Sequence, residues 1–139
     1  MISNIGAFGE GVFKIGMTRR MEPMERIMEL SGAAVPFPFD LHVMLYSDDA
    51  PALECALHQL LEGHRVNLAN TRKEFFQGVK LPEIKTFVQE RGLSAQFTEQ
   101  AEAREYRETL ARREGQDVNG ENKRMLPKFA GSPFAAVTA

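Results

Sequence analysis

Hydrophobic and polar side chains alternate along three stretches of this chain, and a period of two predicts β-strands. The first predicted strand covers residues 1–5, and the glycines within residues 6–11 predict a turn-rich connection to a second strand at residues 12–18. These two strands are expected to form a hairpin. The second strand places Phe13, Ile15 and Met17 on one face, and Lys14, Gly16 and Thr18 on the other.

The third strand is predicted over residues 39–47, with Phe39, Leu41, Val43 and Leu45 on one face and Asp40, His42, Met44 and Tyr46 on the other. Residues 74–76 form a short apolar segment that we expect to pack against the sheet.

A period near 3.6 predicts helices at residues 22–30, 50–62 and 82–91. The first helix has an apolar stripe of Met24, Ile27, Met28 and Leu30. The second has Leu53, Ala56, Leu57, Leu60 and Leu61, and the third has Ile84, Phe87 and Val88. Asp49 and Pro51 are typical of a helix start, and Gly92 is typical of a helix end.

The C-terminal part has a different composition. Residues 98–114 carry many alternating charges and predict a solvated helix, and residues from 115 onward predict a flexible tail. We therefore expect an α+β domain over residues 1–92, with a small, mostly antiparallel three-stranded sheet flanked by helices. Residues 93–139 would add a charged helix and the tail.

Composition limits the possible functions. The 139 residues fit one domain, or one domain with a tail, and the net charge of −2 argues against a strongly basic, non-specific nucleic-acid binder. The single cysteine, Cys55, excludes an internal disulfide and fits a reducing, cytoplasmic setting. No apolar run approaches the roughly 18 residues that a membrane span needs. Neither His42 nor His64 has metal-ligand spacing with Cys55, so we expect no zinc site.

A few charged residues suit chemistry on a phosphodiester. Lys14 lies on a strand that ends at Gly16, Arg26 lies on the first helix, and Glu54 and His58 are four residues apart on the second. Cations bind phosphates, and a carboxylate can hold a metal ion. The simpler interpretation is that Glu54 is a solvated carboxylate, that Arg26 pairs with a glutamate of its own helix, and that His58 only packs. Basic residues form two clusters, which could meet in space or be solvated surface. The first is Lys14, Arg19, Arg20 and Arg26, and the second is Arg65, Arg72 and Lys73.

Five segments occur together in one order: ISNIGAFGEGVFKIGMTRR, PMERIMEL, FPFDLHVMLYSDD, ALECALHQLLEGHRVN and RKEFF. In this order they resemble the GIY-YIG nuclease superfamily. They are most similar to its branch of phage T-five open-reading-frame-type DNA-binding domains, which is related to the meiotically up-regulated-gene GIY-YIG group. The resemblance covers roughly residues 1–79.

The resemblance assigns roles to particular residues. The family's Ile-Gly motif matches Ile15 and Gly16, and its second motif tyrosine falls on Lys14, a departure that is common in this branch. The family's helix arginine falls on Arg26 and its metal-binding glutamate on Glu54. Further positions of the branch match His58, Arg65 and residues 74–76.

These matches imply metal-dependent hydrolysis of DNA, with one Mg²⁺ or Mn²⁺ ion on Glu54 and no small-molecule cofactor. Arg26 would neutralise charge in the transition state, Lys14 would hold a phosphate oxygen, and His58 would act as a base or orient the metal's water ligands. The residues expected to bind the DNA are Arg19, Arg20, Arg65, Arg72 and Lys73.

One motif residue has no counterpart. The family's first-strand tyrosine would precede Met1, so we expect the first strand to be truncated and the chain to be part of a longer protein. Two alternatives to a nuclease therefore stay open. One is a DNA-binding module on the same scaffold with little or no catalysis, and the other is a protein-interaction fragment that works through its charged helix.

Overall fold

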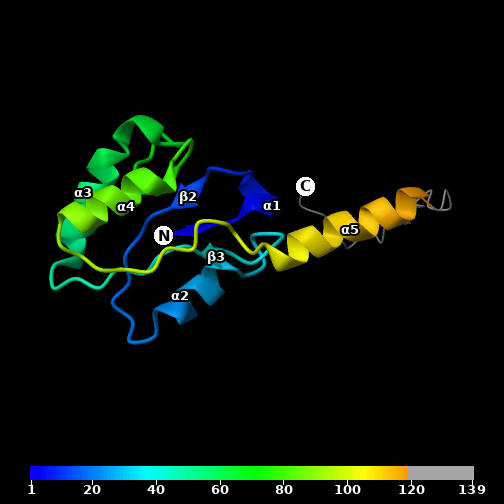
Figure 1. Ribbon diagram of the computed structural model, residues 1–139, viewed down its shortest axis with the longest axis horizontal. Coiled ribbons are helices and arrows are strands. Elements are labelled where there is room, and N and C mark those ends of the chain that lie inside the picture. The colour runs from blue at the N-terminus through cyan, green and yellow to red at the C-terminus, as the bar shows by residue number, and fades with distance from the viewer. Residues whose placement is uncertain (119–139) are drawn as a thin grey trace, which may run out of the picture. The chain divides into compact units, whose positions relative to one another are not determined.

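The computed structural model describes residues 1–118 and has an α+β fold (Figure 1). Its sheet has four antiparallel strands in the order β3-β1-β2-β4, formed by β1 (Ile2–Ser3), β2 (Phe13–Lys14), β3 (Asp40–Leu41) and β4 (Phe75–Phe76). The expected three-stranded sheet is corrected to four strands, because residues 75 and 76 do not pack on the sheet but pair with β2. In that register Lys14 lies opposite Phe75.

β1 and β2 pair as antiparallel neighbours, as expected, but a helix rather than a simple turn joins them. Asn4 ends the strand because its buried side chain accepts a hydrogen bond from the Ala7 amide (3.3 Å) and starts helix α1 (Ile5–Phe8). The same side chain also donates a hydrogen bond from Nδ2 to the Phe37 carbonyl (2.6 Å). The prediction that the first strand continues to Ile5 is therefore wrong.

The three predicted central helices are present as α2 (Pro23–Leu30), α3 (Ala50–Leu60) and α4 (Leu81–Glu90). Asp49 caps α3 by accepting from the Ala52 amide (3.1 Å), and Gly92 follows α4 with a φ of 71°. After α3 the chain continues through a short 3₁₀ turn, η1 (Glu62–His64), instead of extending the helix.

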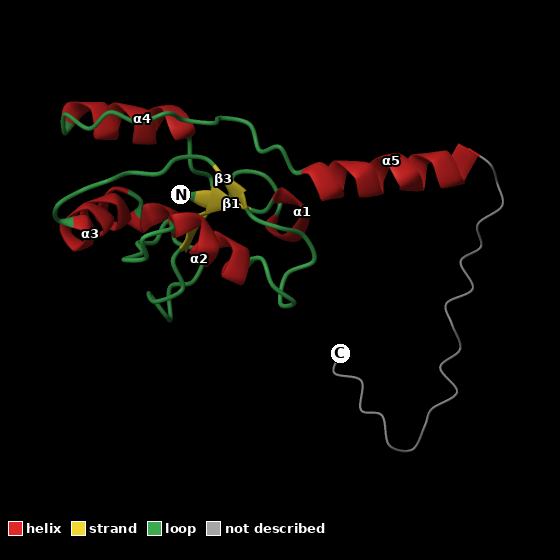
Figure 2. Ribbon diagram, turned by 90° about the horizontal axis from the view of Figure 1, so that it is seen from below, coloured by secondary structure: helices red, strands yellow, loops and turns green. Residues whose placement is uncertain are grey.

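The main core lies between the sheet, α3 and α4. Figure 2 shows these elements from a second direction. It contains Phe13, Ile15, Leu57, Leu61, Phe76, Val79, Leu81, Ile84 and Val88. This cluster confirms the predicted inward positions Phe13, Ile15, Ile84 and Val88, and Phe87 is partly buried against it. The stripe predicted for α2 is wrong at Met24 and Met28, which are exposed, because only Ile27 of that helix is buried. Leu60 and Met17 are also exposed rather than buried.

The third strand is shorter than predicted, and the segment after α4 covers its edge. The Thr98 amide donates to the His42 carbonyl (2.8 Å), and the buried His42 ring donates from Nδ1 to the Thr98 carbonyl (2.5 Å). The Ala103 amide donates to both carboxylate oxygens of Asp40 (3.2 Å each). Because residues 98–103 follow this extended path, the helix expected from residue 98 begins only at Arg104.

The charged helix is α5 (Arg104–Val118). Contacts divide the chain into one compact unit, Met1–Glu108, and a second unit that begins at Thr109. The tail was predicted from residue 115, but α5 continues to Val118; the rest of the predicted tail lies outside the described residues. Within residues 1–118, no helix is both long enough and apolar enough to cross a membrane.

Candidate functional site

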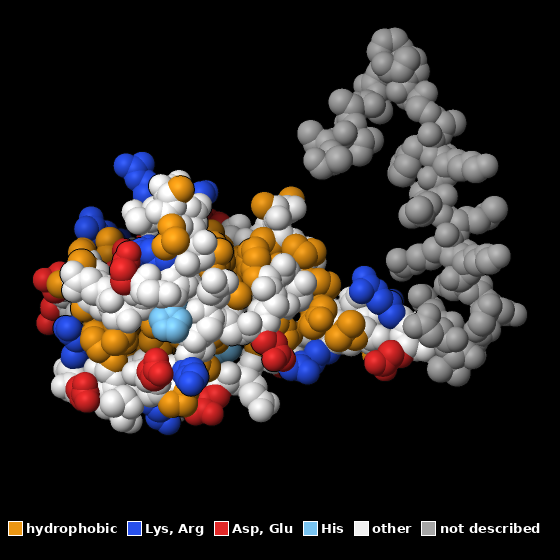
Figure 3. All heavy atoms as spheres, turned by 90° about the horizontal axis from the view of Figure 1, so that it is seen from above, with side chains coloured by type: hydrophobic (Ala, Val, Ile, Leu, Met, Phe, Trp, Pro, Cys, Tyr) orange, Lys and Arg blue, Asp and Glu red, His pale blue; other side chains and the backbone are white. Residues whose placement is uncertain are grey.

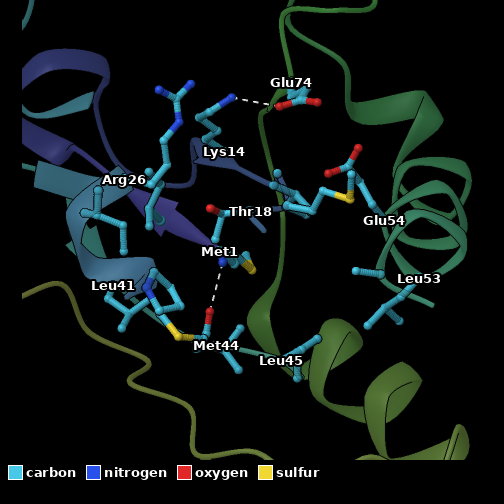
Figure 4. Close-up of a pocket in the computed structure, with 18 of the residues that line it drawn as sticks. Met1, Lys14, Thr18, Arg26, Leu41, Met44, Leu45, Leu53, Glu54 and Glu74 are labelled. Atoms are coloured by element: carbon cyan, nitrogen blue, oxygen red, sulfur yellow. Dashed lines mark hydrogen bonds and ion pairs between the residues drawn. The ribbon is translucent and has the colours of Figure 1, made fainter. Parts of the chain in front are cut away.

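A cavity of about 320 Å³ opens beside the end of β2 and is lined by residues of β2, α2, α3 and the segments at residues 41–46 and 74 (Figure 4). Charged side chains from four parts of the sequence line it, namely Lys14, Arg26, Glu54 and Glu74. The structure thus brings together three of the four residues that the sequence assigns to catalysis.

Lys14 is held by a partner that the sequence analysis does not assign to the site. Its ammonium donates to Oε2 of Glu74 at 2.8 Å, and the two side chains are 17% and 26% exposed. The Lys14 ammonium also lies 5.6 Å from the centroid of the Phe75 ring. The backbone fixes this pair, because the Ile15 amide donates to the Glu74 carbonyl (3.1 Å) beside the β2–β4 ladder.

Glu54 projects from α3 into the cavity (Figure 4). Its Oε2 atom is buried and, among the described residues, is the one buried side-chain oxygen or nitrogen without a hydrogen-bond partner. Buried polar atoms are nearly always paired, because leaving one unpaired costs about 1–3 kcal/mol. The unpaired oxygen is therefore a position that a ligand or a water molecule in the cavity would complete.

His58 lies one turn after Glu54 on α3. Its Nε2 is 2.7 Å from the Ile15 carbonyl oxygen, and its ring centroid is 5.1 Å from that of Phe76. A carbonyl oxygen only accepts, so Nε2 carries the proton and Nδ1 keeps its lone pair. His58 does not line the cavity wall; it lies behind it, against the strand.

Glu54, His58 and Glu74 form a cluster with the dimensions of a metal site. One ligand atom from each lies within 4.8 Å of the other two. The donors are two carboxylates and an imidazole, which are ordinary ligands of divalent cations. The cluster and the unpaired Glu54 oxygen together fit the divalent ion that the sequence implies.

Gly16 keeps the space beside this cluster open. A Cβ atom at this position would lie 3.0 Å from Oε2 of Glu74 and 3.8 Å from the Lys14 ammonium. A side chain at this position would crowd the Glu74 carboxylate, whereas its contact with Lys14 would be an ordinary one, so glycine leaves room beside Glu74.

Arg26 reaches the cavity from α2, and its guanidinium projects to the same side as the Lys14 ammonium (Figure 4). It is 49% exposed and lies 3.3 Å from Glu29, which also binds Arg20. Desolvation alone would raise the pKa of Glu29, but hydrogen bonds from Arg20 and Arg26 and their charges lower that pKa below its ordinary value. Arg19 and Arg20 line the same cavity.

The second basic cluster does not line this cavity. The side chain of Arg65 is only 8% exposed, where it donates to Glu62 (2.7 Å) and to the Thr71 carbonyl (3.3 Å). Its guanidinium also lies 5.2 Å from the Phe76 ring centroid, so its contacts hold the loop at residues 65–71 onto the sheet. Arg72 and Lys73 are exposed on the next turn.

Glu74 is the site residue that the sequence analysis missed. Two signals pointed to it: residues 74–76 match positions of the family branch, and an acidic residue comes directly before the Phe75-Phe76 pair. Reading that pair as a strand beside β2 would have placed Glu74 next to Lys14.

The fold and the cavity define a small α+β domain with a cation-lined cavity and a cluster able to hold a metal ion. Residues 1–91 match the family model of the T5orf172 domain, so the chain belongs to that family. The match covers most of the compact unit, including every residue of the site. No curated protein and no solved structure matches the chain.

Proposed function

We propose that this chain is a DNA-binding domain of GIY-YIG type that hydrolyses phosphodiester bonds with the help of a divalent ion held at Glu54. Membership of the T5orf172 family and the resemblance of residues 1–79 to GIY-YIG nucleases support the class. The cavity supports the chemistry, because cations and carboxylates meet there at the end of the motif strand.

One observation carries this proposal. Oε2 of Glu54 is buried without a partner, and Glu54 belongs to a cluster in which one ligand atom from each residue lies within 4.8 Å of the others. A carboxylate with a merely structural role in this position would be expected to have a hydrogen-bond donor. A bound cation would supply what the protein does not.

The groups in the cavity would each act on a different part of a bound phosphate. A divalent ion at this site would polarise a phosphate oxygen and stabilise the charge on the leaving oxygen. Arg26 has a half-exposed guanidinium that can turn from Glu29 to a phosphate and neutralise its developing charge. Gly16 leaves room for the substrate beside the cluster.

The DNA would be held by a local basic rim and not by the whole surface. Arg19 and Arg20 stand at the cavity, where they can contact phosphates on either side of the scissile bond. On the face drawn in Figure 3, acidic and basic side chains are intermingled, in keeping with the net charge of −2. Because Arg65 is committed to internal contacts, we leave it out of this rim.

A DNA-binding module without catalysis is the second candidate, and one observation favours it. Lys14 stands where the family has its second motif tyrosine, and the chain's two tyrosines, Tyr46 and Tyr106, both lie outside β1 and β2. The phenol that the family uses on these strands is thus missing from them.

The test is relaxation of supercoiled plasmid by the purified chain with Mg²⁺ or Mn²⁺. We expect nicked plasmid from the wild type and from the control Glu90→Gln, which removes an exposed carboxylate of α4, and none from Glu54→Ala. Intact plasmid with the wild type would exclude the nuclease. If that protein still binds DNA, with an affinity that falls steeply as salt is added, the binding-module interpretation would be supported, because phosphate contacts release counterions.

A further inference from the structure

We propose that Glu54, His58 and Glu74 together bind one divalent transition-metal ion, and that this ion takes Glu74 from Lys14 and so releases Lys14 for a phosphate. The proposal deepens the function above by naming two further ligands, the class of metal and a coupling. Metal binding stands on the cluster alone, whereas the role of the released Lys14 rests on the proposed function.

The imidazole of His58 determines the class of metal. Mg²⁺ prefers oxygen ligands, whereas imidazole nitrogen suits first-row transition metals such as Mn²⁺, Co²⁺ and Zn²⁺. The ring is also already oriented, because its Nε2 proton is held by the Ile15 carbonyl at 2.7 Å. Histidines that bind metals commonly donate their other ring nitrogen to such a carbonyl, which leaves the free nitrogen for the ion.

Glu74 is contested between two cations. Its Oε2 atom is bound by the Lys14 ammonium at 2.8 Å, yet one of its oxygens also lies within 4.8 Å of the ligand atoms of Glu54 and His58. The pair is mostly buried, so solvent screens it less than a surface ion pair. An ion bound by all three ligands would share the Glu74 carboxylate with the Lys14 ammonium and repel it, so we infer that it weakens the contact with Lys14.

The exchange changes the charge of the cavity. Without an ion, two carboxylates and one ammonium leave the group formed by Glu54, Glu74 and Lys14 net negative, so this group repels a phosphate although Arg19, Arg20 and Arg26 line the same cavity. A divalent ion makes the same group net positive and leaves the Lys14 ammonium without its partner at the cavity wall. Metal binding should therefore strengthen DNA binding, and by linkage DNA should strengthen metal binding by the same factor.

The first experiment measures metal binding without DNA, by calorimetric titration of Mn²⁺, Co²⁺ and Mg²⁺ into the chelator-treated chain. We expect Mn²⁺ and Co²⁺ to bind at least about tenfold more tightly than Mg²⁺, and His58→Gln to remove most of that preference. The Co²⁺ absorption spectrum, which reports nitrogen ligation, should change in His58→Gln and stay unchanged in His64→Gln. Equal affinity for the three ions, or a spectrum unaffected by His58→Gln, would overturn the ligand assignment.

The second experiment tests the exchange with Lys14→Met. Removing the competing ammonium should tighten Mn²⁺ binding by about tenfold, whereas Lys85→Met, which removes an exposed lysine of α4, should leave it unchanged. Glu74→Gln should weaken Mn²⁺ binding. Tighter Mn²⁺ binding by Lys14→Met would support the exchange, because a poorly folded variant would not bind the ion more tightly. Unchanged or weaker Mn²⁺ binding would overturn it.

The third experiment measures binding of a labelled duplex with and without Mn²⁺. Wild-type affinity should rise with Mn²⁺, and Lys14→Met should show a smaller rise although it binds Mn²⁺ more tightly, because only wild type also releases an ammonium. An equal rise in both proteins would overturn the release of Lys14. Failure of the chain to bind the duplex at all would contradict the proposed function while leaving the metal titrations as a separate result.

Discussion

Glu54→Met should make the metal-free protein more stable while it destroys the metal site. The substitution keeps a side chain of similar length and replaces a carboxylate, whose Oε2 is buried without a partner, by an apolar group. Glu54 lines a cavity together with Leu53 and Leu57, so the methionine has apolar neighbours.

The size of the effect follows from the unpaired oxygen. An unsatisfied buried polar group costs about 1–3 kcal/mol, and its removal should return much of that cost. Glu54 is not fully buried, so we expect a gain of about 1–2 kcal/mol in the free energy of unfolding. For a domain of this size, that gain corresponds to a rise in Tm of roughly 4–10 °C.

The assay is urea and thermal unfolding in the presence of EDTA, followed by the same measurement with Mn²⁺. Wild type should gain stability from Mn²⁺, because a ligand that binds only the folded state stabilises it, and Glu54→Met should not. The control Glu90→Met changes an exposed residue of the same type. A Glu54→Met protein that is less stable than wild type in EDTA would refute the interpretation of Glu54 as a residue kept for a ligand.

Three other outcomes are expected. Burial holds the pKa of His42 below its ordinary value of 6.5, against an opposing hydrogen bond to the Thr98 carbonyl. The unfolded chain therefore binds more protons below that pH, and stability should fall on acidification by up to about 1.4 kcal/mol per pH unit. Between pH 7.5 and 5.5 the free energy of unfolding, measured in urea, should fall less for His42→Gln than for wild type. An equal fall in the two proteins would contradict the argument. Gly16→Val should weaken Mn²⁺ binding several-fold by crowding the neighbouring carboxylate; calorimetry that detects no change would show that the space beside β2 is not needed. Replacing Arg19 and Arg20 by glutamine should reduce the slope of log affinity for DNA against log salt by about 2, and an unchanged slope would remove these residues from the DNA rim.

Local sequence signals were enough for the three central helices, although not for α1 or for the start of α5. The period of apolar positions located α2, α3 and α4, and the cap at Asp49 and the glycine at residue 92 marked their ends. These signals involve neighbours within a few residues, so a single sequence contains them. The exposure of Met24 and Met28 could not be predicted in this way, because it depends on how much of α2 the sheet covers.

The strands show the limit of such signals. β4 has only two paired residues, and its partner β2 lies some 60 residues earlier in the chain, so no local pattern predicts the pairing. The path of residues 98–103 along β3 was also missed, since hydrogen bonds to the His42 carbonyl and to the Asp40 carboxylate create it. These are non-local hydrogen bonds that composition does not encode.

The same limit applies to the site. Lys14, Arg26 and Glu54 were assigned from sequence and do line one cavity. Glu74 was not, because its place beside Lys14 depends on the pairing of β2 with β4. The structure also separates Arg65 from this cavity by giving it internal partners.

The most direct test of the account measures DNA binding and cleavage on the same Glu54→Gln protein. A labelled duplex would be titrated in EDTA for its Kd and then incubated with Mn²⁺ for its rate of cleavage, beside wild type and Glu90→Gln. The account predicts that Glu54→Gln binds the duplex in EDTA at least as tightly as wild type, that wild type and the control cleave it, and that Glu54→Gln loses at least about 100-fold in rate. Cleavage by Glu54→Gln at the wild-type rate would contradict it.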